Sequence, residues 1–150
     1  MEVKRCALTG HREIEKNFDF NRLHDALEDL IESGVEEFYC GMARGFDLIA
    51  LRMLVEFKQQ KKIRLIACIP FDGQERVFEE RDQKEYQTLL TWCDERKIIC
   101  EHYNSGCFLK RNRYMVENSD VVLAYLRKKG GGTFYTVEYA RKLKKELYLI

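Results

Sequence analysis

Strand-like and helix-like segments alternate along the whole chain, and this alternation constrains the fold more than any other feature. Short apolar runs typical of strands lie at 3–9, 35–40, 63–69, 97–103 and 121–126. Longer segments with apolar residues at helical spacing follow them, at 19–33, 46–60, 81–95, 108–118 and 134–145, and a short apolar tail ends the chain. The pattern predicts a Rossmann-like α/β fold, a doubly wound parallel sheet with at least five strands and helices on both faces.

The composition supports one domain. The 150 residues, of which 45% are hydrophobic, suit a single globular domain, 1–150, with a core of its own. The chain has 26 basic and 25 acidic residues, a balance that argues against nucleic acid as a partner, because nucleic-acid-binding proteins usually concentrate positive charge. The sequence shows neither a signal peptide nor an apolar run of membrane-spanning length, so we expect a cytoplasmic protein without a membrane partner.

Cysteines are frequent, but their positions do not indicate a metal site. Cys6, Cys40, Cys68 and Cys100 fall inside or at the end of predicted strands, where we expect small buried apolar side chains. No C-x-x-C pair is present, although structural zinc sites usually contain close ligand pairs of this kind. The sequence therefore predicts no metal and no cofactor.

The residues that carry chemistry follow the predicted strands. In a doubly wound sheet, ligands bind beyond the carboxyl ends of the strands, so the loops at these ends form one candidate site. They contain Gly10, His11 and Arg12 after the first strand, Gly41, Met42, Ala43, Arg44 and Asp47 after the second, Pro70 and Phe71 after the third, and Gly131, Gly132 and Thr133 before the last helix. We expect Gly10, Gly41, Pro70 and Gly131 to surround a single cleft.

The glycine run before the last helix can form a phosphate cradle. Backbone N–H groups at a helix start favour anions, and Thr133 can add a hydroxyl group while capping the helix. The alternative is a flexible loop in which Thr133 is only a cap. The run matches neither the dinucleotide-binding G-x-G-x-x-G pattern nor the P-loop.

Basic side chains on the same loops have two interpretations each. Arg12 and Arg44 can pair with phosphate, or they can form surface ion pairs. His11 can stack on a base or donate a hydrogen bond to ribose or phosphate, or it can simply pack in the loop. We expect Asp47 to cap the second helix and to hold Arg44 or nearby backbone. Arg111 begins the helix after the fourth strand, within reach of the same edge.

Several motifs in order resemble the YpsA-like branch of the SLOG superfamily. They are "TGHR", "GMARGFDLIA", "IPFDGQE", "RNRYMVENSDVVLAYL" and "GGGTFYTVEYA", and together they cover essentially the whole chain. "GMARGFD" is also similar to the glycine-arginine turn of DprA, the DNA-processing relative. The resemblance implies a Rossmann-like domain that binds nucleotides or nucleotide-derived ligands such as ADP-ribose.

A second resemblance, to the lonely guy phosphoribohydrolases, is partial. Arg111 falls where that family has its active-site arginine, and Met115 matches its methionine. In that family the glutamate stands three residues after the threonine of a proline-led glycine motif, whereas here Glu138 stands five residues after Thr133 and the proline is absent. The usual "TGHRP" of the YpsA-like branch also lacks its proline, since Glu13 follows Arg12.

Three functions remain open on these grounds. The first is binding or sensing of a nucleotide-derived ligand, with Phe71 or Tyr135 as stacking surfaces. The second is an N-glycoside hydrolase in which Glu138 is the acid/base and Arg111 holds phosphate. The third, ranked last, is single-stranded DNA binding of the DprA type. The aromatic and leucine side chains exceed the needs of one sheet and are compatible with a homodimer.

Overall fold

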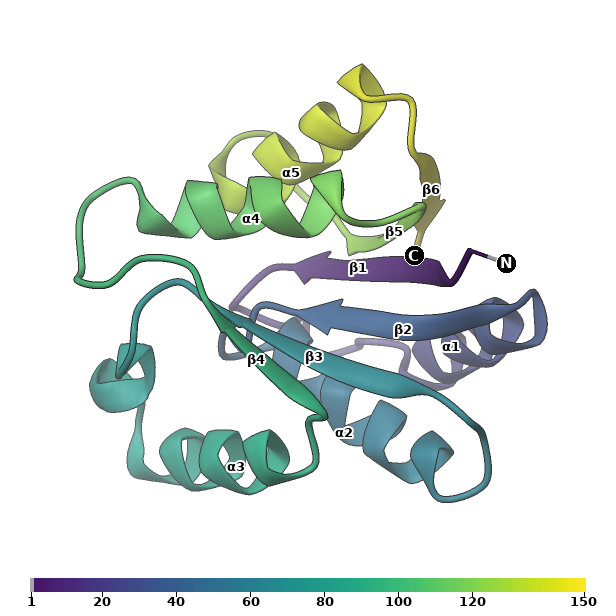
Figure 1. Cartoon of the computed structure of the whole chain (residues 1–150), viewed down its shortest axis with the longest axis horizontal. Coiled ribbons are helices and arrows are strands. Elements are labelled where there is room, and N and C mark those ends of the chain that lie inside the picture. The colour runs from purple at the N-terminus through teal and green to yellow at the C-terminus, as the bar shows by residue number, and fades with distance from the viewer. Residues whose placement is uncertain (1) are drawn as a thin grey trace.

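A six-stranded, all-parallel sheet forms the centre of the computed structural model, which describes residues 2–150 (Figure 1). The strands are β1 (Lys4–Gly10), β2 (Val35–Cys40), β3 (Arg64–Ile69), β4 (Glu95–Ile98), β5 (Val121–Tyr125) and β6 (Glu146–Leu149). The helices are α1 (Phe20–Glu32), α2 (Phe46–Lys58), α3 (Glu80–Thr91), α4 (Cys107–Glu117) and α5 (Gly131–Lys142), with a short 3-10 helix η1 (Gln74–Val77).

The strand order β4-β3-β2-β1-β5-β6 contains the reversal that defines a doubly wound sheet. The chain first builds outward from β1 through β2 and β3 to β4, and then α4 carries it back across the sheet to β5, on the other side of β1. The order of strands therefore reverses between β1 and β5, where ligands bind in this class of fold. The prediction of a Rossmann-like α/β domain is confirmed.

The helices form two layers of unequal size. Side chains of α1, α2 and α3 pack on one face of the sheet, in a core that includes the fully buried Leu23, Leu54 and Tyr86. On the other face only α4 and α5 pack, through residues such as Met115 and Ala140 (Figure 1). Since two helices cover a six-stranded face, its β4 edge stays open.

Local signals set the ends of α1 much as the sequence predicts. The Asp19 side chain caps the helix by accepting a hydrogen bond from Arg22 N–H at 2.9 Å. Gly34, with a φ of +106°, follows its end in a conformation that favours glycine. Among the apolar residues at helical spacing, Leu23, Leu27 and Leu30 are buried and Ile31 is partly buried. Phe20, in the first turn, is 50% exposed and packs edge-on against Phe18.

Four predicted boundaries were wrong. The helix expected at 81–95 is α3, which ends at Thr91. The strand expected at 97–103 is β4 at 95–98, because it pairs only with β3, and as an edge strand it is largely charged. The short apolar segment at the end of the chain, expected to be a tail, forms most of strand β6, which pairs with β5. The last helix begins at Gly131 instead of 134, so the glycines form its first turn.

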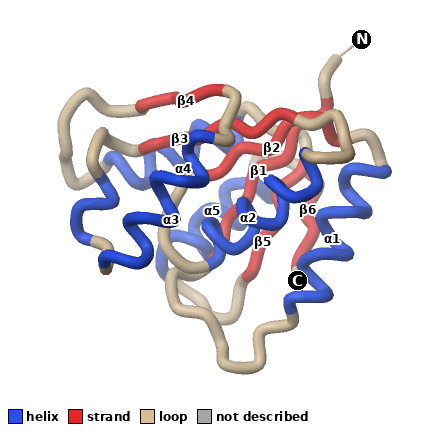
Figure 2. The backbone as a smooth tube through the Cα atoms, turned by 90° about the horizontal axis from the view of Figure 1, so that it is seen from below, coloured by secondary structure: helices blue, strands red, loops and turns tan. Residues whose placement is uncertain are grey.

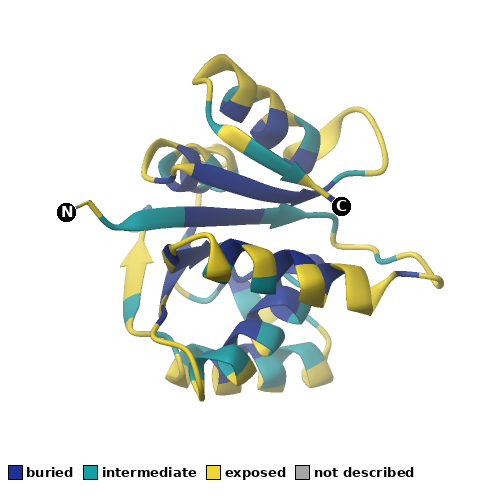
Figure 3. Cartoon of the chain, turned by 90° about the vertical axis from the view of Figure 1, so that its right-hand side faces the viewer, coloured by how far each residue is buried: buried dark blue, intermediate teal, exposed yellow. Residues whose placement is uncertain are grey.

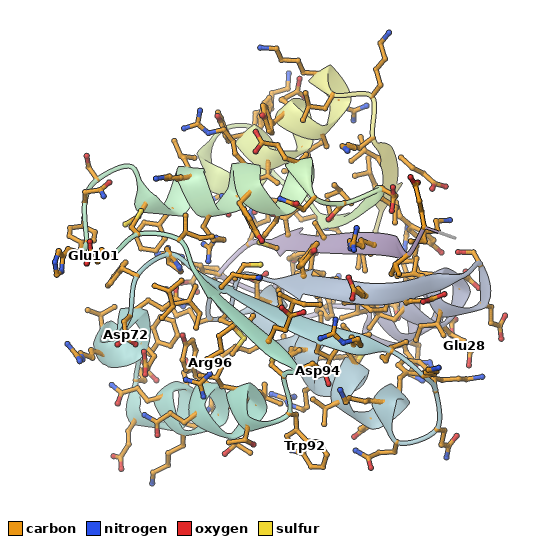
Figure 4. All side chains as sticks on the ribbon, in the orientation of Figure 1. Glu28, Asp72, Trp92, Asp94, Arg96 and Glu101 are labelled. Carbon is orange, nitrogen blue, oxygen red and sulfur yellow. The ribbon has the colours of Figure 1, made fainter. Side chains whose placement is uncertain are left out.

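Asp94 fixes the start of β4. It is labelled in Figure 4, and its carboxylate accepts a hydrogen bond from Leu65 N–H at 2.8 Å and pairs with Lys58 at the end of α2. These contacts hold the pKa of Asp94 below its ordinary value in spite of burial. The edge strand is therefore anchored at one end while its body is exposed.

Three of the four cysteines predicted on strands lie there, whereas Cys100 follows the end of β4. Cys6, Cys40, Cys68 and Cys100 are buried, and burial raises the pKa of Cys6 and of Cys68 to about 12, so both thiols stay protonated at neutral pH. Within residues 2–150, none of the helices has the length and apolar character needed to cross a membrane.

Candidate functional site

A cavity of about 540 Å³ opens at the carboxyl ends of the central strands. In Figure 1 the arrowheads of β1 and β2, which mark these carboxyl ends, point to the side where α4 begins. Its walls are the loops after β1, β2 and β5, the first half of α4 and the first turn of α5. Gly10, Gly41 and Gly131 all line it, so three of the four loops expected around one cleft meet there, and Pro70 does not.

Arg111 connects the ends of two strands at the floor of the cavity. Its guanidinium is 4% exposed, and Nη1 donates hydrogen bonds to the carbonyl groups of Gly41 and Cys68, at the ends of β2 and β3. A side chain at position 41 would place its Cβ 2.7 Å from Nη1, so this approach requires glycine. Burial lowers the pKa of Arg111, but a guanidinium stays charged at neutral pH. The floor therefore carries a fixed positive charge.

Asp47 places a buried carboxyl group beside this charge. It is the second residue of α2, and Gly45 occupies the capping position, so Asp47 does not cap the helix. Its Oδ2 accepts a hydrogen bond from Ala43 N–H at 3.2 Å, as expected for contact with nearby backbone. Burial raises the pKa of Asp47 to about 6, although Arg111 opposes this change. Strongly shifted carboxyl groups in cavities often belong to functional sites.

Arg44 does not contact Asp47 and instead pairs with Glu13. Its Nη2 lies 2.7 Å from Glu13 Oε1, and both side chains line the cavity from neighbouring loops. Glu13 occupies the position of the proline in the "TGHRP" motif of the YpsA-like branch. The acid at this position therefore neutralises one of the cavity's arginines.

A second ion pair closes the side near β5. Arg127 Nε lies 2.8 Å from Glu15 Oε1, which also accepts a hydrogen bond from the Tyr125 hydroxyl at 3.0 Å. The Arg127 guanidinium stacks over the Tyr125 ring at 4.6 Å and donates to the carbonyl of Ile150. These contacts hold the pKa of Glu15 below its ordinary value. The loop after β5 is thus fixed to the loop after β1.

His11 joins the same two loops through its ring. Nε2 accepts a hydrogen bond from Arg127 N–H at 2.8 Å, and the His11 carbonyl accepts one from Phe46 N–H at 3.2 Å. Burial, with Lys128 and Arg127 nearby, lowers the pKa of His11, so the ring is neutral at pH 7. Since Nε2 is occupied, only Nδ1–H is left to donate to a ligand.

Besides Arg111, two cations of the cavity form no ion pair within residues 2–150. They are Arg12, whose guanidinium lies 5.4 Å from the centre of the Phe108 ring, and Lys128, in the loop before α5. Phe108 lines the cavity, whereas Phe71 does not and packs edge-on against Phe108 from outside at 5.8 Å. Of these two phenylalanines, Phe108 is therefore the one that a ligand in the cavity can contact.

The first turn of α5 completes the cavity wall. Gly130 and Gly131 have φ values of +84°, which bring the chain into the helix through a turn that favours glycine. No side chain caps this helix, so its first N–H groups are available to a ligand. Thr133 is only 7% exposed, lines the cavity, and its hydroxyl group forms no hydrogen bond to any part of the chain from residue 2 to 150.

The model of the YpsA family, described as the YspA SLOG family, matches residues 6–150. The chain belongs to this family. Its relatives include UPF0398 proteins of Bacillus cereus strains G9842 and B4264, each 28% identical over 154 residues. The match covers 93% of this chain and 84% of each relative. Family membership thus extends over nearly the whole domain.

Solved structures similar to this YspA SLOG protein share its fold. DNA processing protein A of Helicobacter pylori matches with a TM-score of 0.69 and 21% identity over 97% of this chain, and that of Streptococcus pneumoniae with 0.67 and 17% over 98%. The chain spans 64% and 50% of their lengths. The molybdenum cofactor carrier protein of Chlamydomonas reinhardtii matches with 0.60 and 14%, over 99% of this chain and 76% of the carrier.

Four other predicted site residues of this family member lie outside the cavity. Glu138 is exposed on α5, where it pairs with Arg141 at 3.5 Å. Tyr135 stacks on Tyr139 on the same helix, and the Met42 side chain is fully buried in the core. Phe71, as described above, packs behind Phe108. In each case the side chain contacts other parts of the protein or solvent instead of the cavity.

Sequence reasoning missed a further set of cavity residues: Glu13, Glu15, Phe108, Asn112, Tyr125, Arg127 and Lys128. Arg127 and Lys128 precede the glycine run, so their position beside the expected phosphate cradle could have predicted that they line the site. Phe108 and Asn112 flank Arg111 at the start of a helix that begins at the same edge. Glu15 and Tyr125 gave no signal, because their contact joins segments 110 residues apart.

Proposed function

We propose that this protein binds a nucleotide-derived ligand, a nucleoside phosphate or an ADP-ribose-like molecule, in the cavity at the carboxyl edge of the sheet. One observation carries the proposal. Arg12 and Lys128, which lack acidic partners within residues 2–150, line the same cavity as the uncapped start of α5. Free cations beside free backbone N–H groups form the environment that phosphate groups prefer.

The charges of the cavity support a ligand with about two negative charges. Five basic side chains line it, at positions 12, 44, 111, 127 and 128. Glu13 neutralises Arg44, Glu15 neutralises Arg127, and Asp47 attracts Arg111. The two remaining cations balance one phosphate monoester or one diphosphate linkage.

Other groups of the cavity suit the uncharged parts of a nucleotide. The Phe108 ring offers a surface for a base, and Asp47 and Asn112 offer hydrogen-bond acceptors for ribose hydroxyls. Two of the structures with this fold belong to a protein named for DNA processing, and the one from Helicobacter pylori binds single-stranded DNA. That ligand is itself a chain of nucleotides.

We propose binding without turnover, because the candidate acid for hydrolysis is misplaced. Glu138 is exposed and paired with Arg141, outside the cavity that holds Arg111. A general acid must reach the bond that it protonates, and this carboxylate faces solvent instead. The two candidate functions therefore predict different outcomes in one experiment.

The experiment combines calorimetry with detection of free base. Purified protein is titrated with AMP, ADP, ATP and ADP-ribose, and the same mixtures are incubated and analysed by chromatography. We expect saturable binding of AMP and ADP-ribose with no released base. Base release above the protein-free background would support the hydrolase, and absence of binding to all four nucleotides would refute the proposal.

A glycine substitution locates the binding. A Cβ at Gly132 would lie 3.7 Å from Asn112 Nδ2, an ordinary contact, so Gly132→Val leaves room for folding while its methyl groups crowd the first turn of α5. We expect affinity to fall by about tenfold or more, which corresponds to roughly 1.4 kcal/mol. Gly106→Val is the matched control, because Gly106 precedes α4 outside the cavity and has a φ of −99°. Equal affinities in the two folded variants would contradict the assignment.

A further inference from the structure

Strand β4 forms an exposed edge of the sheet. It pairs only with β3, and nothing lies beyond it in the strand order (Figure 2). Three of its four residues are exposed, as the yellow arrow at the left of Figure 3 shows. Edge strands of this kind can accept another extended segment through their free backbone groups.

A groove of about 730 Å³ lies between β4 and α4. It lies at the border of the layer that α4 and α5 form on this face of the sheet, where α4 contacts β3. Its lining consists of Arg96, Lys97, Ile98, Ile99, Lys110, Arg113, Tyr114 and Glu117. None of these residues lines the cavity described above, so α4 presents different residues to each of the two sites.

The groove is strongly basic, with four cations and one carboxylate. Lys97 lies 3.5 Å from Glu95, but Arg96, Lys110 and Arg113 form no ion pair in the chain from residue 2 onward. Arg96 is labelled on β4 in Figure 4. The one acid, Glu117, accepts a hydrogen bond from Tyr139 on α5. The groove therefore concentrates positive charge on a protein whose net charge is only +1.

The groove also has an apolar component. Ile98 is 50% exposed in the middle of this charged edge, next to Ile99. Tyr114 is half-buried, and its ring packs edge-on against Tyr39 at 6.3 Å. Its lining thus combines cations, isoleucines, one half-buried tyrosine and a free strand edge.

We propose that this groove binds an acidic segment of a partner protein, extended alongside β4. Carboxylates of such a segment pair with Arg96, Lys110 and Arg113, and its alternate side chains contact Ile98. A second copy of this chain would bring two sets of cations together. Single-stranded nucleic acid normally stacks its successive bases on several aromatic rings, whereas the lining of the groove has one, the half-buried Tyr114.

A peptide of alternating Glu and Val, about eight residues long and labelled with fluorescein, is a direct probe of the groove. Fluorescence anisotropy of the full chain should show saturable binding that weakens as salt rises from about 50 to about 200 mM. A peptide of alternating Glu and Pro has the same charge but cannot pair with a strand edge, and it should bind about tenfold more weakly. Equal affinity for the two peptides would refute an extended segment along β4.

Charge reversal identifies the surface. We expect Lys110→Glu with Arg113→Glu to weaken binding of the Glu-Val peptide by at least about tenfold. The matched control is Lys61→Glu with Lys62→Glu, which makes the same change of net charge at an exposed turn before β3. Circular dichroism confirms that both variants fold. Equal losses in the two variants, or tighter binding of an oligothymidylate of equal charge than of the peptide, would overturn the proposal.

Discussion

The cavity and the β4–α4 groove both concentrate basic side chains, but they differ in how many of these cations have acidic partners. In the cavity, Glu13, Glu15 and Asp47 accompany three of the five cations, and Arg111 also donates to two backbone carbonyls. In the groove, three of the four cations lack an acidic partner within the chain from residue 2 to 150. The cavity is thus a preorganised site, whereas the groove is a solvated surface.

Because of this difference, substitutions in the two regions should have different effects on stability and on binding. Arg111 and Asp47 are 4% and 6% exposed, so changing them affects folding as well as ligand binding. Arg96, Lys97 and Arg113 are exposed, so changing them alters binding only. Four predictions follow from this contrast, and their expected effects decrease from one to the next.

The largest effect is expected for Arg111→Met. The substitution removes the hydrogen bonds that Arg111 donates to the carbonyls of Gly41 and Cys68, of which Gly41 keeps only the one from Gln74 Nε2, and it removes the charge beside Asp47. We expect the free energy of unfolding to fall by about 3–5 kcal/mol, as when one partner of a buried charge is removed. Urea denaturation measures it. Arg113→Met, two residues along the same helix, should change stability by less than about 0.5 kcal/mol, and similar losses for both variants would erase the distinction.

Asp47 should make stability depend on pH. Its pKa is about 6 in the folded chain and near 3.8 when exposed, so between these values the folded state holds a proton that the unfolded state has lost. The contribution of this carboxyl group to the free energy of unfolding therefore falls by about 2 kcal/mol as pH rises from 4 to 7. Asp47→Asn should remove that decline when urea midpoints are compared at pH 4 and 7. Parallel pH profiles for the two proteins would contradict the buried position of the carboxyl group.

Among the cavity cations, Arg12 should matter more than Arg44. Arg12 has no acidic partner between residues 2 and 150, so Arg12→Ala removes a charge-assisted contact of about 1.5–3 kcal/mol to a bound phosphate. Arg44 is already paired with Glu13, and Arg44→Ala should cost less. Calorimetry with ADP-ribose compares them. A larger loss for Arg44→Ala would show that the ion pair opens when the ligand binds.

The smallest effect should come from Glu13→Gln. It frees Arg44 for the ligand and should tighten binding of AMP or ADP by about 0.2–1 kcal/mol, the usual range for exposed ion pairs. Glu138→Gln makes the same chemical change in an exposed ion pair outside the cavity and serves as the control. Weaker binding in Glu13→Gln would mean that Glu13 contacts the ligand directly.

The sequence predicted the regular parts of the molecule because periodicity reflects burial. The buried stripe of α1, the parallel sheet and the position of the cavity at its carboxyl edge all followed from alternation and from the glycines after the strands. Edge strands β4 and β6 were shifted or missed, because a four-residue strand with one neighbour has little need of an apolar pattern.

The roles of individual site residues were harder to predict. The loop position of Arg44 predicted that it lies at the site but could not show its partner Glu13. The sequence also could not show that Glu138 lies on an exposed face of α5, outside the cavity. The net charge of +1 also concealed the basic groove, because acids elsewhere on the surface balance its cations. Local charge depends on tertiary contacts, which neither composition nor spacing contains.

Calorimetric titration of ADP-ribose into two double variants tests the central claim most directly, since each removes two cations from one of the two regions. For Arg12→Ala with Lys128→Ala, we expect the affinity of the cavity to fall by about thirtyfold or more, which is roughly 2 kcal/mol. For Lys110→Glu with Arg113→Glu, we expect the affinity of wild type. Loss of ADP-ribose binding in the groove variant, with retention in the cavity variant, would contradict the assignment of the nucleotide site.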